Sequence, residues 1–252
     1  MTAARLRGGL LVTLLIAAAP AAAWAQSPWA VEMRTLHRRY HENPARLDVV
    51  RERLEAVAKG TPHIEDLIAL AQVSWTWGDI RATTEDQRLE AYARGRVAAQ
   101  RAIDMDPKNA LAHFWHATNT ARWGQTKGVL RSLFGLPAVK DQLQTVIDLN
   151  PNLTAVYALG GYVYLEVPAL LGGDLDTAEE MFRKGLAQDS RFTGMRLGLA
   201  KTLVRKGRIN EARQELRAVL DEKAPSNPAD WTMKDSKEAR ELLDILKTKS
   251  GS

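Results

Sequence analysis

The amino-acid sequence predicts an all-α protein: a tetratricopeptide-like superhelix of paired antiparallel helices with inserted loops. Four segments open a helix in the same way, "GTPHIEDLIAL", "MDPKNALAHFW", "LNPNLTAVYAL" and "QDSRFTGMRLG". Pro62, Pro107, Pro151 and Ser190 take the equivalent place in these segments, at intervals of 45, 44 and 39 residues. Proline suits the first helical turn, where its missing N–H would be unpaired anyway. This recurrence indicates a helix-pair repeat whose unit, about 34 residues in tetratricopeptide proteins, is lengthened by insertions.

Residues 1–25 have the pattern of a secretory signal peptide. Arg5 and Arg7 precede an apolar run at residues 10–19, and a small-x-small sequence ends at Ala25. This order predicts export to the periplasm and cleavage before Gln26. The apolar run is short for a bilayer span, so cleavage is favoured over a retained membrane anchor, which stays the alternative.

Composition excludes several kinds of site. The sequence contains no cysteine, which excludes a lipid-anchoring cysteine, a disulfide and a thiolate metal site. Loss of the two leader arginines lowers the formal net charge from +5 to +3, and this mild excess does not favour nucleic acid as a partner. We therefore expect an exported, soluble protein with no stable membrane anchor after cleavage.

The rest of the chain divides into three parts. Residues 26–61 predict an N-terminal helix pair, "PWAVEMRTLHRRYH" and "ARLDVVRERLEAVAKG". Residues 62–222 hold the repeat units, in which Gly78, Gly124 and Gly207 are expected to end the first helix of a pair. Small and apolar residues at the helix crossings mark the second helices: Ala178, Phe182 and Gly185 in one unit, and Ala212, Leu216 and Val219 in the last. Residues 223–252 predict a loop and a polar capping helix.

Three insertions lengthen the units. Residues 123–140 predict a short extra helix between Gly128 and Gly135, and "DIRATTEDQRLEAYARG" extends the first unit with polar residues. The third insertion is the loop "VPALLGGD", with its aliphatic and glycine residues at Val167, Pro168, Leu170, Leu171, Gly172 and Gly173. Pro168 cannot continue a helix, and the glycines allow backbone conformations closed to other residues. The leucines either cover the edge of the core or form a channel rim or subunit contact, since exposed aliphatic patches mark interaction sites.

These insertions carry a family resemblance. "AHFWHATNTARWGQTKG", "LFGLPAVKDQLQTVIDLNPN", "GGYVYLEVPALLGGDLDTAEEMFRKGLAQDS" and "GRINEARQELRAVLD" follow one another in this order. Over about residues 45–245 the chain resembles the TatT component of TRAP-transporter-associated proteins, a periplasmic tetratricopeptide-like family. Its most specific parts are the R-W-G and P-x-L-L-G-G-D sequences. The resemblance implies an internal channel, a homotrimer and pairing with a periplasmic solute-binding protein that passes ligand to a membrane permease. A lipid-anchored member is known, and this chain lacks the cysteine for such an anchor.

No catalytic or metal motif stands out. His113 and His116 share a helix face, and His37 and His41 lie one turn apart, but neither pair encloses the glutamate of an H-E-x-x-H zinc site. The histidines therefore favour packing or surface roles. We expect no enzymatic activity, no cofactor and no metal.

Repeat geometry predicts which side chains face the concave side. They fall ten, six, three and two residues before each turn glycine, with Val167 standing in for the glycine of the third unit. The rule selects Ile68, Gln72, Trp75 and Thr76; Phe114, Thr118, Ala121 and Arg122; Tyr157, Gly161, Tyr164 and Leu165; and Leu197, Lys201, Val204 and Arg205.

This set is aromatic in the middle and cationic at its C-terminal end, with few acids. The expected ligand-binding residues are Trp75, Phe114, Arg122, Tyr157, Tyr164, Lys201 and Arg205. They suit a small amphipathic anion, with the rings against its apolar part and the cations near a carboxylate. The predicted function is a non-enzymatic ligand-binding or adaptor component for a TRAP-type transporter. The alternative is a repeat scaffold that binds an envelope protein or an extended peptide.

Overall fold

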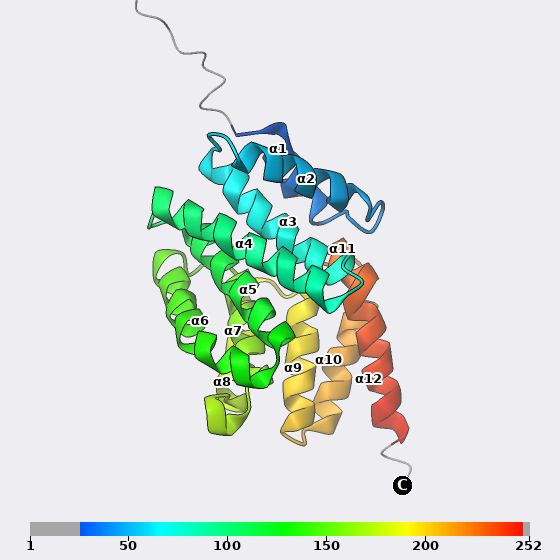
Figure 1. Cartoon of the computed structure of the whole chain (residues 1–252). Coiled ribbons are helices and arrows are strands. Elements are labelled where there is room, and N and C mark those ends of the chain that lie inside the picture. Colours follow the sequence, from blue (N-terminus) through cyan, green and yellow to red (C-terminus); the bar gives the residue numbers. More distant parts are fainter. Residues whose placement is uncertain (1–25, 249–252) are drawn as a thin grey trace, which may run out of the picture.

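The computed structural model describes residues 26–248, apart from the side chains of residues 129–134, and within that part every regular element is helical (Figure 1). The predicted all-α, tetratricopeptide-like fold class is thereby confirmed. The predicted signal peptide lies outside the described residues. In chain order the elements are α1 Pro28–Leu36, α2 Arg46–Ala58, α3 Ile64–Ile80, α4 Glu85–Met105, α5 Ala110–Lys127, α6 Val129–Leu149, α7 Ala155–Glu166, η2 Ala169–Leu171, α8 Leu175–Gln188, α9 Thr193–Arg205, α10 Ile209–Asp221, α11 Pro228–Asp230, the π-turn η3 Trp231–Asp235 and α12 Ser236–Thr248.

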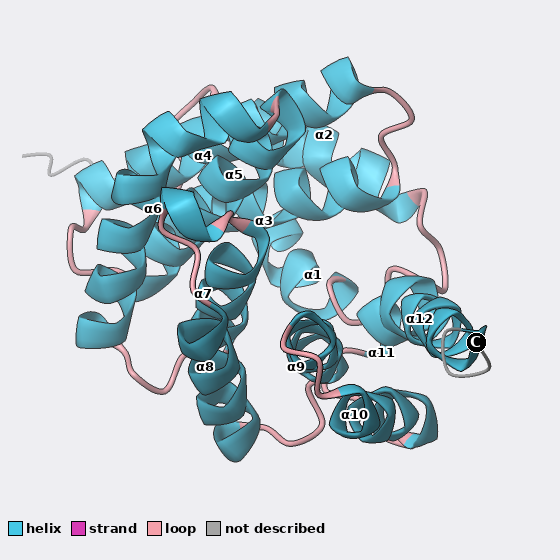
Figure 2. Cartoon of the chain, turned by 90° about the horizontal axis from the view of Figure 1, so that it is seen from below, coloured by secondary structure: helices cyan, strands magenta, loops and turns pink. Residues whose placement is uncertain are grey.

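The helices pack in consecutive pairs, α3 with α4, α5 with α6, α7 with α8 and α9 with α10. Along the stack α3 also packs on α5, and α7 on α9, so the first helices of the pairs form an inner layer (Figure 2). No helix among residues 26–248 combines the length and the apolar composition needed to cross a membrane.

Small residues bring the layers close together at the third and fourth pairs. The Phe182 ring of α8 is fully buried between two glycines of the inner helices. A Cβ added at Gly161 of α7 would lie 2.5 Å from this ring, and one at Gly198 of α9 would lie 2.3 Å from it. The second-helix residues expected at the crossings, Ala178, Phe182 and Gly185 with Ala212, Leu216 and Val219, are all buried as predicted.

The helix ends differ from the sequence prediction. Pro107 lies in the turn before α5, whose N-cap is Asn109 with its side chain accepting from the Ala112 N–H, so the proline sets the approach to the helix. Gly78 and Gly124 lie inside their helices, whereas Gly207 follows α9 with a positive φ of 76°. Gly78 is small for a packing reason, because a Cβ there would lie 2.5 Å from the Tyr92 ring of α4.

The insertion after α5 also differs from the prediction. Residues 129–149 form one helix, α6, with Pro137 inside it, rather than a short extra helix between Gly128 and Gly135. Gly128 separates α5 from α6 with a φ of 94°. Because glycine adopts this conformation without strain, the chain reverses at a single residue and needs no additional helix there.

The two ends of the described chain meet. The C-terminal segment, residues 226–248, packs through η3 on α9 and through α12 on α10. The Tyr40 hydroxyl, in the turn after α1, donates a 2.7 Å hydrogen bond to Asp230, 190 residues away in sequence. Residues from both ends therefore border the concave side of the inner layer.

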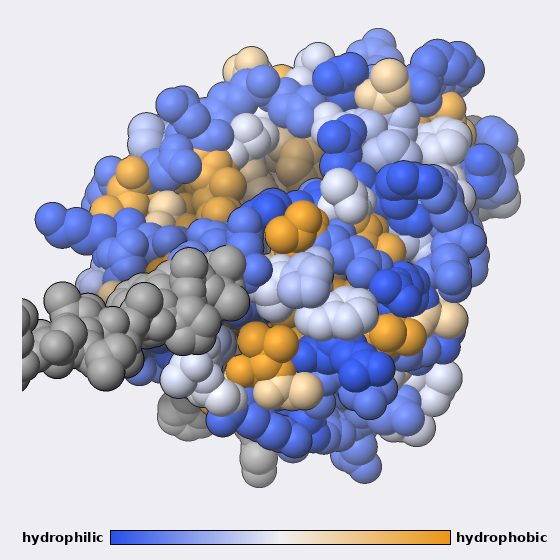
Figure 3. Space-filling view, turned by 90° about the horizontal axis from the view of Figure 1, so that it is seen from above, coloured by the Kyte–Doolittle hydropathy of each residue, from blue (hydrophilic) through white to orange (hydrophobic). Residues whose placement is uncertain are grey.

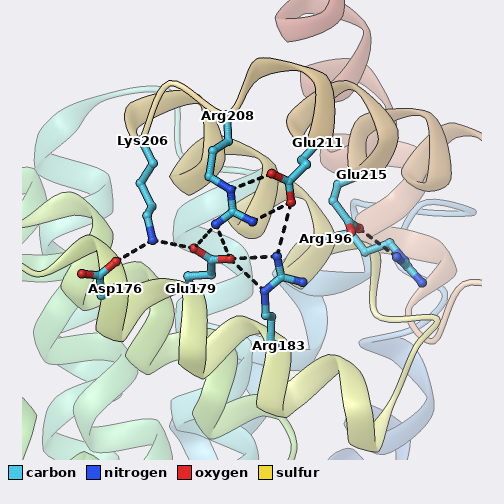
Figure 4. Close-up of polar contacts among 8 residues, drawn as sticks. All are labelled: Asp176, Glu179, Arg183, Arg196, Lys206, Arg208, Glu211 and Glu215. Carbon is cyan, nitrogen blue, oxygen red and sulfur yellow. Dashed lines mark hydrogen bonds and ion pairs between the residues drawn. The ribbon is translucent and has the colours of Figure 1, made fainter.

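A cluster of ion pairs fixes α8 to the turn between α9 and α10 (Figure 4). Glu179 of α8 is 8% exposed and accepts from Lys206 Nζ at 2.7 Å, from Arg208 Nη1 at 2.7 Å and from Arg183 Nε at 2.9 Å. Arg208 also forms a bidentate pair with Glu211. One carboxylate thus joins three cations from two consecutive helix pairs.

Candidate functional site

A cavity of about 1040 Å³ occupies the concave side. Its walls come mainly from the inner helices α3, α5, α7 and α9, with contributions from α4, from α6, from His37 and Tyr40 after α1, and from the C-terminal segment. From above, Figure 3 shows hydrophobic residues gathered in and beside a hollow that is rimmed by hydrophilic ones. The molecule therefore offers an apolar interior that is enclosed on several sides.

The apolar wall is aromatic where α3 and α5 meet. The Trp75 and Trp115 rings lie 5.7 Å apart between centroids, and the Phe114 ring meets Trp115 edge-on at 4.9 Å. Trp75 Nε1 is buried with no hydrogen-bond partner among the described residues. Aliphatic side chains continue the wall: Leu111, Leu136, Val139, Leu159, Val163 and Leu197.

One polar border of the cavity is built around Asp79. Its carboxylate accepts from the Tyr92 hydroxyl at 2.7 Å and from Arg122 Nη2 at 2.6 Å, and Lys234 Nζ lies 3.9 Å away. Burial by itself would raise the pKa of Asp79, but the charges of Arg122 and Lys234 hold it below its usual value. The guanidinium of Arg122, whose side chain is 39% exposed, is thus paired with a buried carboxylate.

Lys234 of η3 connects this border to the N-terminal turn. Its Nζ lies 2.7 Å from Asp230 and 5.0 Å from the centre of the Trp75 ring. Burial would lower the pKa of Lys234, and the adjacent Asp230 and Asp79 raise it above its usual value. Because Asp230 also accepts from Tyr40, the cavity wall and the contact between the chain ends share one network.

The carboxylates of Asp235 and Glu238 make a second polar border, beside α9. Asp235 is 7% exposed and accepts a 2.7 Å hydrogen bond from the Thr193 hydroxyl. Burial, with the nearby charge of Asp230, raises the pKa of Asp235 to about 6. Glu238 pairs with Lys201 at 2.5 Å, and Lys201 Nζ lies 5.7 Å from the centre of the Tyr162 ring.

Four of the seven predicted ligand-binding residues line the cavity: Trp75, Phe114, Arg122 and Lys201. The other three lie elsewhere. Tyr157 is 1% exposed and donates from its hydroxyl to the Pro151 carbonyl, and the Tyr164 ring lies 4.5 Å from Lys140 Nζ. Arg205 donates to the Leu165 carbonyl and pairs with Glu166.

On α7 the residues that line the cavity are shifted by one position from the predicted ones. Ala158, Tyr162 and Glu166 line the cavity, each one residue later than the corresponding predicted residue. Pro168, which follows the helix end and lines the cavity, is therefore the equivalent of the turn glycine, and Val167 is not. Because proline cannot continue a helix, Pro168 could have been identified from the sequence as the end of this helix, and counting from it selects the residues that line the cavity.

The expectation of few acids on this face is wrong. The described lining includes six acidic side chains, Asp79, Glu166, Asp189, Asp230, Asp235 and Glu238, and four basic ones, Arg96, Arg122, Lys201 and Lys234. Three of the acids belong to the C-terminal segment. The repeat rule considered the first helices alone and therefore omitted a segment that reaches the cavity through tertiary contacts.

The loop after α7 contributes both to the cavity and to the outer surface. Val167 and Pro168 line the cavity, whereas Leu170 is 99% exposed and Leu171 38% exposed. Gly172 has a φ of 95°, and a Cβ at Gly173 would lie 1.8 Å from the Val167 carbonyl oxygen. Leu170 therefore does not cover the edge of the core, and the loop holds its shape through its glycines.

Among the described residues, no group of three or more His, Asp or Glu side chains is placed to hold a metal ion. His113 has a packing role: its ring nitrogens lie 2.6 Å from Gln142 Oε1 and 2.8 Å from the Pro107 carbonyl oxygen.

Comparison with protein families gives two matches. The family model described as Regulator of microtubule dynamics protein 1-3 matches residues 31–168, and a Tetratricopeptide repeat model matches residues 169–234. No curated protein sequence matches the chain.

One solved structure shares the fold, and a second is similar over part of the chain. A thermophilic TPR protein of Thermus thermophilus is 20% identical, with a TM-score of 0.60 over 85% of this chain and 95% of that one. MamA of Desulfovibrio magneticus RS-1 is 16% identical, with a TM-score of 0.48 over 77% of this chain and 94% of that one. The chain is a tetratricopeptide-like helical scaffold.

Proposed function

The chain belongs to the family described as Regulator of microtubule dynamics protein 1-3, and from this premise we propose that it is a non-enzymatic scaffold whose cavity holds a small amphipathic molecule. Family membership and the tetratricopeptide match support a binding role rather than catalysis. The fold does not identify the ligand. We infer the chemical class of the ligand from the residues that line the cavity.

The observation that carries the proposal is the narrowing of the concave face by the C-terminal segment. A tetratricopeptide groove that receives an extended peptide must stay open along its length. Here residues 226–238 border that face, held by the Tyr40–Asp230 hydrogen bond and by Lys234 between Asp230 and Asp79. The remaining volume, about 1040 Å³, is at the upper end of the roughly 300–1,000 Å³ of small-molecule sites.

The lining favours a ligand with a long apolar part. Aromatic and aliphatic side chains dominate the wall, and their burial against a ligand contributes about 25 cal/mol for each Å² removed from water. The basic residues expected to receive an anion are occupied, since Arg122 pairs with Asp79 and Lys201 with Glu238. We therefore keep the small amphipathic ligand that the sequence predicts. We do not propose that its polar end is an anion.

A cavity-filling substitution tests this proposal. Ala158 of α7 lines the cavity, so Ala158→Phe should weaken the binding of decan-1-ol, which is measured by tryptophan fluorescence. Ala187→Phe, on the exposed side of α8, is the matched control and should bind as the unmodified protein does. If the unmodified protein fails to bind decan-1-ol, the cavity is not a small-molecule site, and the alternative of a scaffold for a peptide or an envelope protein is favoured.

We further propose that the protein acts in the periplasm as an adaptor for a solute-binding protein and a TRAP-type transporter, and that it assembles as a homo-oligomer. The leader-like residues 1–25 and the resemblance to the TatT family support this proposal. Native mass spectrometry of protein secreted by a bacterial host tests it. We expect a chain starting at Gln26, an oligomer mass and a co-purified small ligand, whereas an uncleaved, monomeric and empty chain would contradict it.

A further inference from the structure

The cavity's charged residues also indicate the ligand's polar end. We propose that the ligand carries a cationic, amine-type head group that docks against the carboxylate of Asp235. This inference rests on the proposed cavity function and adds the chemistry and place of the head group.

The position of Asp235 is the first argument. Its side chain ends η3 and lines the cavity while remaining 7% exposed. A hydrogen bond from the neutral Thr193 hydroxyl reaches one carboxylate oxygen, Oδ2. Two lysines of the cavity wall form ion pairs with other acids, Lys234 with Asp230 at 2.7 Å and Lys201 with Glu238 at 2.5 Å, although the charge of Lys234 also favours the ionised form of Asp235. A buried carboxylate without an ionic partner is unfavourable, and a bound cation would compensate it.

The net charge of the cavity lining also favours a cationic head group. Its six acidic and four basic side chains leave a formal excess of negative charge, although the protein as a whole is positive. Three of the four bases already have acidic partners on the wall. The fourth, Arg96, lies on α4 with its guanidinium 5.2 Å from the centre of the Trp123 ring, and α4 packs on α3 and α5 rather than on η3 or α9.

The surroundings of Asp235 leave room for an ammonium group. Gly194 lines the cavity beside the carboxylate, and a Cβ there would lie 3.6 and 3.8 Å from its two oxygens. A side chain at this position would therefore cover the carboxylate, whereas glycine leaves it open. The Phe192 ring, 3.4 Å from the same Cβ position, also lines the cavity, and an aromatic face beside a carboxylate suits a cation.

Three probes with the same chain length test the inference: decylammonium, decan-1-ol and decanoate, each below its micelle concentration at pH 7.5. Isothermal titration calorimetry should show decylammonium binding about tenfold more tightly than decan-1-ol, the effect of one charge-assisted contact, and decanoate binding most weakly. Asp235→Asn keeps an acceptor for Thr193 and should remove the advantage of decylammonium over decan-1-ol. Asp221→Asn, an equal charge change on the exposed side of α10, should keep the advantage.

The outcomes separate the two proposals. Equal affinity for the three probes, or tightest binding of decanoate, overturns the cationic head group and leaves the cavity function standing. An advantage for decylammonium that survives in Asp235→Asn overturns the assignment to this residue. Failure of all three probes to bind contradicts the cavity function and the head group together. Circular dichroism of each variant establishes that it is folded.

Discussion

Replacing Glu179 by glutamine should weaken the packing between the third and fourth helix pairs. The substitution keeps the shape of the side chain and removes its charge, while Lys206, Arg208 and Arg183 remain around it. Three clustered cations would then share a neutral amide. We expect a loss of stability that is large at neutral pH and small in acid.

The magnitude follows from the pKa of the carboxyl group. Burial of Glu179 would raise its pKa, but hydrogen bonds from Lys206, Arg183 and Arg208 lower it from 4.5 to about 2. At about 1.4 kcal/mol for each tenfold change in proton affinity, this lowering corresponds to roughly 3–4 kcal/mol of folding free energy. The three cations are 22–48% exposed, so solvent screening reduces the expected loss to about 1.5–2.5 kcal/mol.

The sign of the pH dependence is fixed by the same shift. The pKa is lower in the folded protein than in the unfolded chain, so the stabilisation is fully present above about pH 5 and disappears as the pH falls towards 2. Urea unfolding of the unmodified protein and of Glu179→Gln should therefore differ by about 2 kcal/mol at pH 7 and converge as the pH falls to about 2.

The neighbouring residue provides the control. Glu180 is exposed on the same helix, and Glu180→Gln removes the same charge without touching the cluster, so its effect should stay within about 0.5 kcal/mol. Equal effects of the two substitutions at pH 7 would refute the reasoning, as would a loss for Glu179→Gln that does not change with pH.

Three further substitutions have expected outcomes. Asp235→Asn should stabilise the unliganded protein by about 1–3 kcal/mol at pH 7.5, because burial raises the pKa of this carboxyl from 3.8 to about 6; the gain, measured by urea unfolding, should fade as the pH drops from 6 to 4. Changing Leu170 and Leu171 to serine should barely shift monomer melting and should weaken the oligomer in native mass spectrometry; strong destabilisation with an unchanged oligomer would assign the loop to the core. Gly161→Ala should destabilise by about 1–3 kcal/mol through overpacking, whereas Gly160→Ala, whose Cβ meets its neighbours at 3.5 Å or more, should be tolerated in the same melting assay.

The fold was predictable because its signals are local. Helix starts recur at intervals, and small residues such as Gly185 and Ala212 mark the crossings, so pattern alone indicates paired helices. The ends of helices were less predictable. Gly78 resembles a terminator in sequence, but the Tyr92 ring needs its small size in mid-helix, and nothing local distinguishes a packing glycine from a capping one.

Only the part of the cavity wall that is formed by the repeat helices could be predicted from the sequence. Trp75 and Phe114 lie on regular inner helices, and counting back from Gly78 and Gly124 places both on the cavity wall even though these glycines lie inside their helices. Asp235 meets Thr193 across 42 residues and Tyr40 meets Asp230 across 190, and no periodicity encodes such contacts. The C-terminal segment has the pattern of a polar capping helix in sequence, and this pattern gives no sign that its carboxylates line the cavity.

The contact between Tyr40 and Asp230 changes how the whole molecule should come apart. In an open solenoid each unit touches its neighbours alone, so the ends fray first and opening can begin anywhere. A hydrogen bond between the first turn and the C-terminal segment makes these two regions neighbours as well. Loosening α1 then exposes Asp230 and releases η3, so the amides of both ends should exchange with solvent deuterium at similar rates. Tyr40→Phe should separate those rates and turn a single cooperative opening into two.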